Sequence, residues 1–200
     1  MLRAVALTCS LKPSPAESST ELLAQQVLDA LAAHDVEGES VRVVDHDVKP
    51  GVDADMGDGD EWPRLRERVM AADILVFATP TWMGHMSSVA QRVLERLDAE
   101  ISETDDAGRP ALADKVAVIA VVGNEDGAHA IIADAFQGLA DVGYTIPSQG
   151  SVYWNGEAMQ RTDYKDLAET PEKVATTTQT VARHAAHLAA LLSARPYPAP

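Results

Sequence analysis

The sequence predicts an α/β protein whose five parallel strands form an open, doubly wound sheet with helices on both faces. Apolar runs of strand length alternate along the chain with segments of helical periodicity, which is typical of βαβ units. One run, Val116–Val122, is almost wholly apolar, as expected of a central strand that is buried on both faces. With 200 residues, the chain is long enough for one such domain. We therefore expect a single domain over residues 1–194, followed by a short tail at residues 195–200.

The individual elements follow from local pattern. In the first helical segment, apolar residues recur at the i, i+3, i+4 and i+7 positions from Ala24 to Leu31. The expected helices begin at Ser19 or Thr20, cover Trp62–Ala71 and Ser87–Leu97, and continue in the stripes Ile132–Leu139 and Val181–Leu192. The expected strands are Leu2–Thr8, Ser40–Asp45, Ile74–Thr79, Val116–Val122 and a weaker one within Tyr144–Val152, which Pro147 interrupts.

Composition excludes several classes of function. The formal net charge is −15, which repels the phosphates of nucleic acid and the anionic surface of a membrane, so we expect neither as a partner. The single cysteine, Cys9, excludes an internal disulfide and a thiolate zinc cluster. No segment approaches the ~18 apolar residues of a membrane span, and the first residues lack a signal-peptide cleavage pattern. We therefore expect a cytoplasmic protein without membrane insertion.

Ligands of doubly wound sheets bind beyond the carboxyl ends of the strands, so the loops after the first, third and fourth strands form the candidate site. The first loop, Cys9–Ser19, lacks the glycine patterns of a Rossmann site and of a P-loop. A tyrosine phosphatase would need an arginine six residues after Cys9, where Pro15 stands. A hydroxyl-rich loop with one cation remains, before a helix start that suits a phosphate monoester: Ser10, Lys12, Ser14, Ser18, Ser19 and Thr20. The alternative is an ordinary polar turn with a helix N-cap.

The second and third loops have features that suit a flat ring. In the segment Pro80–Ser87, Trp82 and Met83 can flank a heteroaromatic ring, and Gly84 allows the backbone to approach it. The alternative is that Trp82 belongs to the core or to an interface. The third loop, Gly123–His129, offers a run of backbone amides for the polar edge of such a ring.

Together, the three loops resemble those of the NAD(P)H-dependent FMN reductases and related quinone reductases of the flavodoxin-like superfamily. The resemblance depends on Ser10-x-Lys12 with Ser18-Ser19-Thr20, on the segment Thr79–Ser87 and on Gly123–His129. The commoner phosphate loop has Gly before the first Ser and Arg after it, where this chain has Cys9 and Lys12. The resemblance implies FMN as cofactor, its phosphate and ring held by Ser10, Lys12, Ser18, Ser19, Thr20, Pro80, Thr81, Trp82, Met83, Gly84, Gly123, Asn124, Glu125, Asp126, Gly127 and His129.

The implied function is an oxidoreductase that transfers hydride from NADH or NADPH through FMN to a quinone, a flavin or a similar small acceptor. FMN would carry the chemistry, with His129 as a candidate assistant. Only one ring-side loop supplies an aromatic residue, which leaves one ring face open for a nicotinamide. The alternatives are a flavodoxin-type one-electron carrier and a non-catalytic binding or regulatory protein. Three aromatics near the cofactor edge, Trp82, Tyr153 and Trp154, predict a homodimer or homotetramer.

Three further features carry less weight. The acidic segment Asp45–Glu61 does not match EF-hand spacing and is expected to be a solvated loop, so no metal site is predicted. His184 and His187 lie three residues apart on the last helix without a zinc-enzyme motif. The long segment Tyr153–Glu169 is expected to cover the substrate side of the ring, to dock on a partner subunit, or to be a surface excursion.

Overall fold

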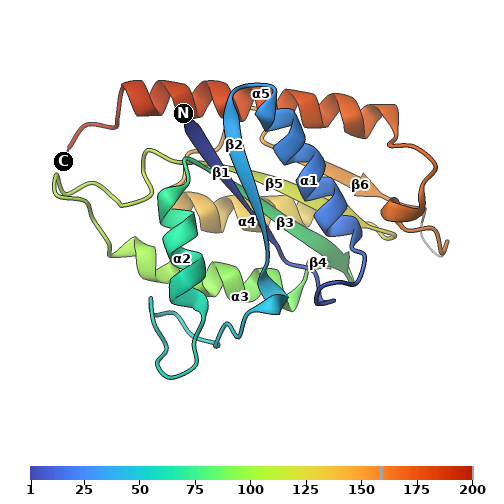
Figure 1. The fold of residues 1–200 in the computed structure, drawn as a ribbon, viewed down its shortest axis with the longest axis horizontal. Helices are drawn as coiled ribbons and strands as arrows, with labels where there is room; N and C mark the ends of the chain where they lie inside the picture. The colour runs from blue at the N-terminus through green and yellow to red at the C-terminus, as the bar shows by residue number, and fades with distance from the viewer. Residues whose placement is uncertain (158–159, 200) are drawn as a thin grey trace.

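The computed structural model describes residues 1–157 and 160–199, and its centre is a parallel sheet in the order β2-β1-β3-β5-β6 (Figure 1). This order is the flavodoxin-like order of doubly wound sheets, so the predicted fold of five parallel strands is confirmed. A sixth, two-residue strand, β4, pairs antiparallel with the end of β3. The strands are β1 (Leu2–Thr8), β2 (Val36–Arg42), β3 (Ile74–Trp82), β4 (His85–Met86), β5 (Val116–Gly123) and β6 (Ser151–Asn155).

Helices cover both faces of the sheet. Along β1 the side chains alternate: Ala4 and Ala6 pack into the cluster with α1 and α5, whereas Val5 and Leu7 pack into the cluster with α2, α3 and α4. In Figure 1, α5 runs along the top of the molecule, across the strands. The helices are α1 (Ser19–Ala32), α2 (Trp62–Ala71), α3 (Ser88–Leu97), α4 (Ala128–Asp141) and α5 (Glu172–Ala194).

The interior strands match their predictions closely. In β5, the residues from Val116 to Val122 are all buried, because β5 lies between β3 and β6 and has helices above and below. β3 begins at Ile74 as expected but continues three residues beyond Thr79, to Trp82. The expected loop Pro80–Ser87 is therefore mainly a β-hairpin, in which Trp82 pairs with His85 across the turn.

The second strand was predicted at Ser40–Asp45, which is too late in the sequence but overlaps the observed strand at Ser40–Arg42. The structure places β2 at Val36–Arg42, and Val43–Asp45 forms a short 3₁₀ turn instead. β2 is an edge strand that pairs only with β1, so its middle residues, 37–40, are exposed and polar. Hydrophobic pattern does not mark such a strand, because residues 37–40 contribute no buried apolar side chain.

The last strand was predicted too early. Pro147 cannot donate a ladder hydrogen bond, and the chain before it contributes only an isolated bridge between Thr145 and Val116. β6 begins at Ser151 and ends at Asn155. Tyr153 and Trp154 therefore lie on a strand, where they face opposite sides of the sheet, and not on a loop as expected.

Several other expectations concern features away from the sheet. Within residues 1–157 and 160–199, no group of three or more His, Cys, Asp or Glu side chains is arranged to hold a metal ion. No helix in those ranges combines the length and the apolarity that a membrane crossing requires. His184 lies with Nδ1 2.7 Å from the carbonyl oxygen of Ser148. The single domain over residues 1–194 and the tail at 195–200 stay predictions, and Pro200 lies outside the described residues.

Candidate functional site

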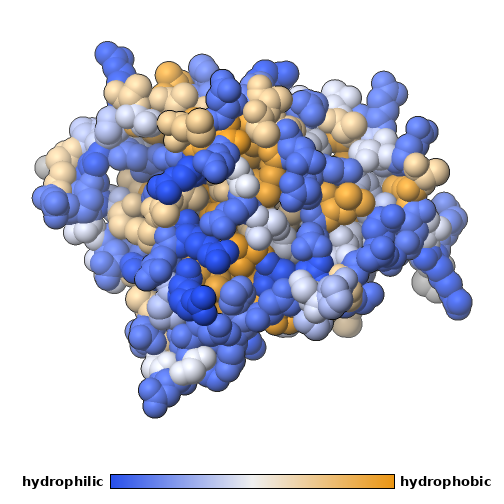
Figure 2. Space-filling model, viewed as in Figure 1, coloured by the Kyte–Doolittle hydropathy of each residue, from blue (hydrophilic) through white to orange (hydrophobic). Residues whose placement is uncertain are grey.

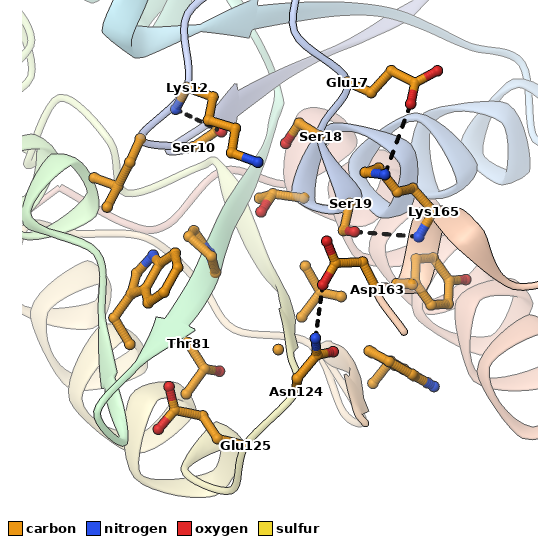
Figure 3. A pocket seen from close by; sticks show the side chains of 18 residues that line it. Ser10, Lys12, Glu17, Ser18, Ser19, Thr81, Asn124, Glu125, Asp163 and Lys165 are labelled. Atoms are coloured by element: carbon orange, nitrogen blue, oxygen red, sulfur yellow. Dashed lines mark hydrogen bonds and ion pairs between the residues drawn. The ribbon is translucent and has the colours of Figure 1, made fainter. Parts of the chain in front are cut away.

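A cavity of about 240 Å³ lies at the carboxyl ends of β1, β3, β5 and β6, where the strand order reverses (Figure 3). All three predicted loops contribute to it. Eleven of the sixteen predicted cofactor-binding residues line the cavity: Ser10, Lys12, Ser18, Ser19, Thr20, Pro80, Thr81, Trp82, Gly123, Asn124 and Glu125. The cavity lining does not include Met83, Gly84, Asp126, Gly127 and His129, and it includes seven residues that the sequence analysis did not select: Leu11, Glu17, Val122, Trp154, Asp163, Tyr164 and Lys165.

One end of the cavity is the N-terminus of α1. Ser18 is the N-cap, and its Oγ accepts a hydrogen bond from the backbone N–H of Glu21 at 3.3 Å. Ser19 and Thr20 form the first turn, where backbone N–H groups without helical partners favour an anion. Ser10 Oγ accepts from the N–H of Lys12 at 3.2 Å, which folds the preceding loop toward the same end. These groups can hold a phosphate monoester.

Arg42, at the end of β2, binds the loop that precedes α1. Its side chain is 4% exposed and forms an ion pair with Glu21. Its Nη1 also donates to the carbonyl oxygens of Ala16 at 2.6 Å and Lys12 at 3.3 Å. Three contacts with one rigid, planar group fix the loop before α1, so the phosphate end is ordered by a residue that does not line the cavity.

The first two loops are joined beneath the cavity by buried hydrogen bonds. Ser87, the N-cap of α3, donates from Oγ to the carbonyl oxygen of Cys9 at 2.7 Å and accepts from the N–H of Ala90 at 3.1 Å. The N–H of Ser87 donates to Thr79 Oγ1 at 3.1 Å. Complete burial raises the pKa of the Cys9 thiol far above its ordinary value, so Cys9 stays neutral and has no nucleophilic role.

The second and third loops are joined at the far end of the cavity by Glu125. Its carboxylate accepts hydrogen bonds from the backbone N–H groups of Met83 at 2.9 Å and Gly84 at 3.2 Å. Met83 has a φ of +53° and Gly84 a φ of +78°, the left-handed conformation of a tight turn. A Cβ atom at Gly127 would lie 2.7 Å from Gly84 Cα, so only glycine allows this approach. Gly84 and Gly127 thus allow the two turns to lie in direct contact.

A buried polar group in the ring end of the cavity has no protein partner. Thr81 is 4% exposed, and its Oγ1 makes no hydrogen bond to any described residue. A Cβ atom at Gly123 would lie 2.7 Å from Thr81 Cβ, so glycine is required where the two loops meet. Buried hydroxyls in folded proteins nearly always have a partner. The hydrogen-bonding edge of a flavin ring would supply one, so the residues present fit FMN.

β6 sends its two aromatic residues to different places. Trp154 lines the cavity and packs on Tyr164, with ring centroids 5.4 Å apart. Tyr153 faces the other side of the sheet, where its hydroxyl lies 3.0 Å from His129 Nε2. His129 is therefore paired with Tyr153 outside the cavity lining, and a role for it as an assistant in the chemistry stays a prediction.

The segment that follows β6 returns to the cavity. Asn124 donates from Nδ2 to Asp163 Oδ1 at 2.7 Å, and the backbone N–H of Lys165 donates to Ser19 Oγ at 3.2 Å (Figure 3). Tyr164 donates from its hydroxyl to Gln26 Oε1 at 2.6 Å. The geometry supports the expectation that part of Tyr153–Glu169 covers the cavity. Residues 158–159 of that segment lie outside the described residues.

Comparison with known proteins shows the family of this chain. The sequence pattern of the NADPH-dependent FMN reductase family matches residues 2–159. The crystal structure of RosB with the bound intermediate 8-demethyl-8-formylriboflavin-5'-phosphate has a TM-score of 0.89 and 31% identity, over 98% of this chain and 82% of that one. An apo NADH:FMN oxidoreductase shares the fold, with a TM-score of 0.67 and 23% identity over 98% of this chain and 92% of that one.

Two curated relatives are longer than the part that this chain matches. The 8-demethyl-8-aminoriboflavin-5'-phosphate synthase of Streptomyces davaonensis is 35% identical over 166 residues, which is 78% of this chain and 65% of the relative. The divalent metal cation transporter MntH of Mycobacterium bovis is 38% identical over 169 residues, which is 82% of this chain and 25% of the relative. The chain thus spans about two thirds of one and a quarter of the other.

The order of the strands and the place of the cavity at their carboxyl ends define a flavodoxin-like protein. More particularly, the chain belongs to the NADPH-dependent FMN reductase family. The cofactor of this family is FMN, and NAD(P)H is its electron donor. The resemblance inferred from the three loops is confirmed.

Proposed function

We propose that the chain is an oxidoreductase that transfers hydride from NADH or NADPH, through FMN, to a small acceptor such as a quinone or a free flavin. The observation that carries this proposal is the cavity itself. It joins the helix start at Ser18–Thr20, which suits an anion, to an end that lies between Pro80–Trp82 and Gly123–Glu125. FMN supplies the redox chemistry when bound, and the protein supplies its position and surroundings.

The side chains at the ring end support hydride transfer over one-electron carriage. Trp82 is 53% exposed at the edge of the cavity. Tyr153 is paired with His129 on the other side of the sheet, and Trp154, which lines the cavity, is packed on Tyr164 of the segment after β6. One ring face would then stay accessible to a nicotinamide, as a hydride donor requires.

The test is an anaerobic reduction. The FMN-loaded protein is mixed with NADH and, separately, with NADPH, and the visible absorbance of the flavin is followed, with free FMN as the control. We expect full bleaching that is much faster than for free FMN with at least one nucleotide. Absence of bleaching with both nucleotides, together with reversible one-electron photoreduction, would instead establish a one-electron carrier.

A second candidate function is chemical modification of the flavin itself. Its support is the similarity to RosB and to the synthase of Streptomyces davaonensis, whose names describe riboflavin-5'-phosphate altered at position 8. The flavin would then be the substrate. The test is the mass of the flavin recovered after incubation in air with a nitrogen donor such as ammonium or an amino acid. A changed mass favours this candidate, whereas unchanged FMN with continuing NAD(P)H oxidation favours the first.

The predicted homodimer or homotetramer and the cytoplasmic location form part of this proposal. Trp82 and Met83, the latter 88% exposed, form an apolar edge beside the cavity that a second copy would cover. Trp154 packs on Tyr164 and lines the cavity, so it does not belong to this edge. Light scattering should give a multiple of the chain mass of 21.3 kDa. A mass of 21.3 kDa at micromolar concentration contradicts the assembly.

A further inference from the structure

The segment at residues 160–171, here called the strap, lies beyond the residues that match the family pattern, 2–159. We propose that the strap supplies a second phosphate-binding cation, Lys165, which makes the cavity select flavins that carry a 5'-phosphate over riboflavin. This inference rests on the proposed placement of the FMN phosphate at the start of α1.

The strap is held against the cavity by hydrogen bonds at three successive residues. Asp163 accepts from Asn124, Tyr164 donates to Gln26, and the N–H of Lys165 donates to Ser19 Oγ. Tyr164 is 2% exposed, so its ring anchors the strap in the core between α1 and β6. The backbone of Lys165 is therefore fixed at the first turn of α1.

The hydrogen bond at Ser19 also determines what that hydroxyl can do. Ser19 Oγ accepts from the N–H of Lys165, so its own hydrogen is available to donate to an anion in the cavity. In Figure 3, Lys12 and Lys165 lie on the two sides of Ser18 and Ser19. A phosphate at the start of α1 would thus have Lys12 of the first loop on one side and Lys165 of the strap on the other.

The charges of the residues that line the cavity favour a second lysine at the phosphate end. Among the described residues that line the cavity, the cations are Lys12 and Lys165 and the carboxylates are Glu17, Glu125 and Asp163. Without Lys165, the charge of Lys12 would be offset by Glu17 at the same end. A phosphate monoester carries about two negative charges at neutral pH, so this end needs a net positive charge to hold it.

The present ion pairs of Lys165 do not prevent this role. Its Nζ lies 2.6 Å from Asp166 and 3.8 Å from Glu17, and these carboxylates are 49% and 86% exposed. Ion pairs with exposed carboxylates contribute little to stability and exchange readily. A phosphate within the cavity offers two charges and several acceptor oxygens. Lys165 itself is 22% exposed and lines the cavity, so its ammonium group can turn to the phosphate without loss of the strap's anchors.

The test compares the affinities of the apoprotein for FMN and for riboflavin, measured by quenching of flavin fluorescence. In Lys165→Met we expect the Kd for FMN to rise about tenfold to a hundredfold, the scale of one charge-assisted hydrogen bond, and the Kd for riboflavin to stay unchanged. Lys165→Arg should restore most of the FMN affinity. The control is Lys173→Met, an exposed lysine on α5, which should alter neither Kd.

The variant Ser19→Asp separates failure of this inference from failure of the phosphate placement, because it puts a carboxylate at the start of α1. Weaker FMN binding in Ser19→Asp, with unchanged binding in Lys165→Met, would overturn the role of Lys165 alone. Unchanged FMN binding in Ser19→Asp would overturn the phosphate placement and the inference with it. Equal weakening of FMN and riboflavin in Lys165→Met would show that the strap is a wall without selectivity for phosphate.

Discussion

Two of the long irregular segments in the described part of the chain are both polar and serve different parts of the molecule. The acidic segment, residues 46–61 between β2 and α2, and the strap, residues 160–171, are both polar and rich in carboxylates. The acidic segment is fixed by buried charge to α3, and none of its residues lines the cavity. The strap is fixed by hydrogen bonds to residues that do line it. Composition alone therefore does not separate a structural excursion from a functional one.

The acidic segment is organised by one buried arginine. Arg96, on α3, is fully buried and donates to the carbonyl oxygens of Asp53 at 2.7 Å and Lys49 at 3.0 Å. It also pairs with the buried carboxylate of Asp60 at 2.8 Å and lies 5.7 Å from the ring centroid of Trp62. The tip of the segment projects from the body of the protein as a hydrophilic surface (Figures 1 and 2). Its charge is thus neutralised at the base and solvated at the tip.

The largest effect is expected when the buried ion pair between Arg96 and Asp60 is removed. Arg96→Met leaves the Asp60 carboxylate buried without its partner, which should lower the free energy of unfolding by about 3–5 kcal/mol. The Kd for FMN should not change, because the acidic segment does not line the cavity. Urea unfolding and a flavin titration measure the two quantities, with the exposed Arg64→Met as the control. A weaker FMN affinity in folded Arg96→Met would contradict the claim that the acidic segment has no part in FMN binding.

The same ion pair predicts a dependence on pH. Burial by itself raises the pKa of Asp60, but the Arg96 guanidinium and the N–H groups of Met56, Lys49 and Trp62 outweigh it and hold the pKa well below the ordinary value. The stabilisation is therefore present above the unfolded pKa of about 3.9 and is lost as pH falls through the folded pKa. The difference in unfolding free energy between the wild type and Arg96→Met should shrink as the pH is lowered below about 4. A constant difference would contradict the role of the Asp60 charge.

A smaller effect is expected at the anchor of the strap. Tyr164→Phe removes the hydrogen bond to Gln26 and should lower the free energy of unfolding by about 0.5–1.5 kcal/mol. Because the strap carries cavity residues, the Kd for FMN should rise as well, by up to about tenfold. The matched control is Tyr197→Phe, whose hydroxyl lies 3.1 Å from Thr145 Oγ1, away from the cavity. Equal FMN affinity in both variants would mean that the strap does not support the site.

The smallest effect tests whether charge or hydrogen bonding fixes each segment. Asp163→Asn retains an oxygen that accepts from Asn124, so it should change the unfolding free energy by less than about 0.5 kcal/mol. It should leave FMN binding equal or slightly tighter, because a negative charge leaves the cavity. The same change at Asp60 removes the partner of a buried arginine and should cost several times more. Similar unfolding midpoints for the two variants would remove the distinction between the segments.

The sequence predicted the parts of the fold that burial determines. The apolar run of β5 was placed correctly because both faces of this strand are buried. The helix Trp62–Ala71, with Pro63 in its first turn, was placed correctly because it buries one apolar stripe. The edge strands β2 and β6 were misplaced, and each of them pairs with only one neighbouring strand of the parallel sheet. The exposed middle of β2 has no apolar side chain, and the segment predicted for the last strand contains Pro147. The hydrophobic pattern predicts a strand less well where the strand has a neighbouring strand on one side only.

The site was predicted to the extent that strand ends determine it. The three loops meet as expected, because the carboxyl ends of parallel strands share one edge. Asp163, Tyr164 and Lys165 were missed because they form no motif and reach the cavity through a tertiary contact with α1. The signal that pointed toward them was the length of the irregular segment after β6. Glu125 was selected as a cofactor residue, but the structure shows it as the acceptor for two backbone amides of the hairpin.

The close contact between the two ring-side turns has a kinetic consequence. Glu125 binds the turn after β3, and Gly84 lies against Gly127, so the two turns cannot separate without loss of both contacts. The ring end of the cavity thus behaves as one rigid body. We expect any opening of the cavity to involve the strap, which is held by hydrogen bonds to Asn124 and Gln26 and by the buried ring of Tyr164. The residence time of a bound flavin would then depend on how often these contacts break together, at a place far in sequence from the turn after β3.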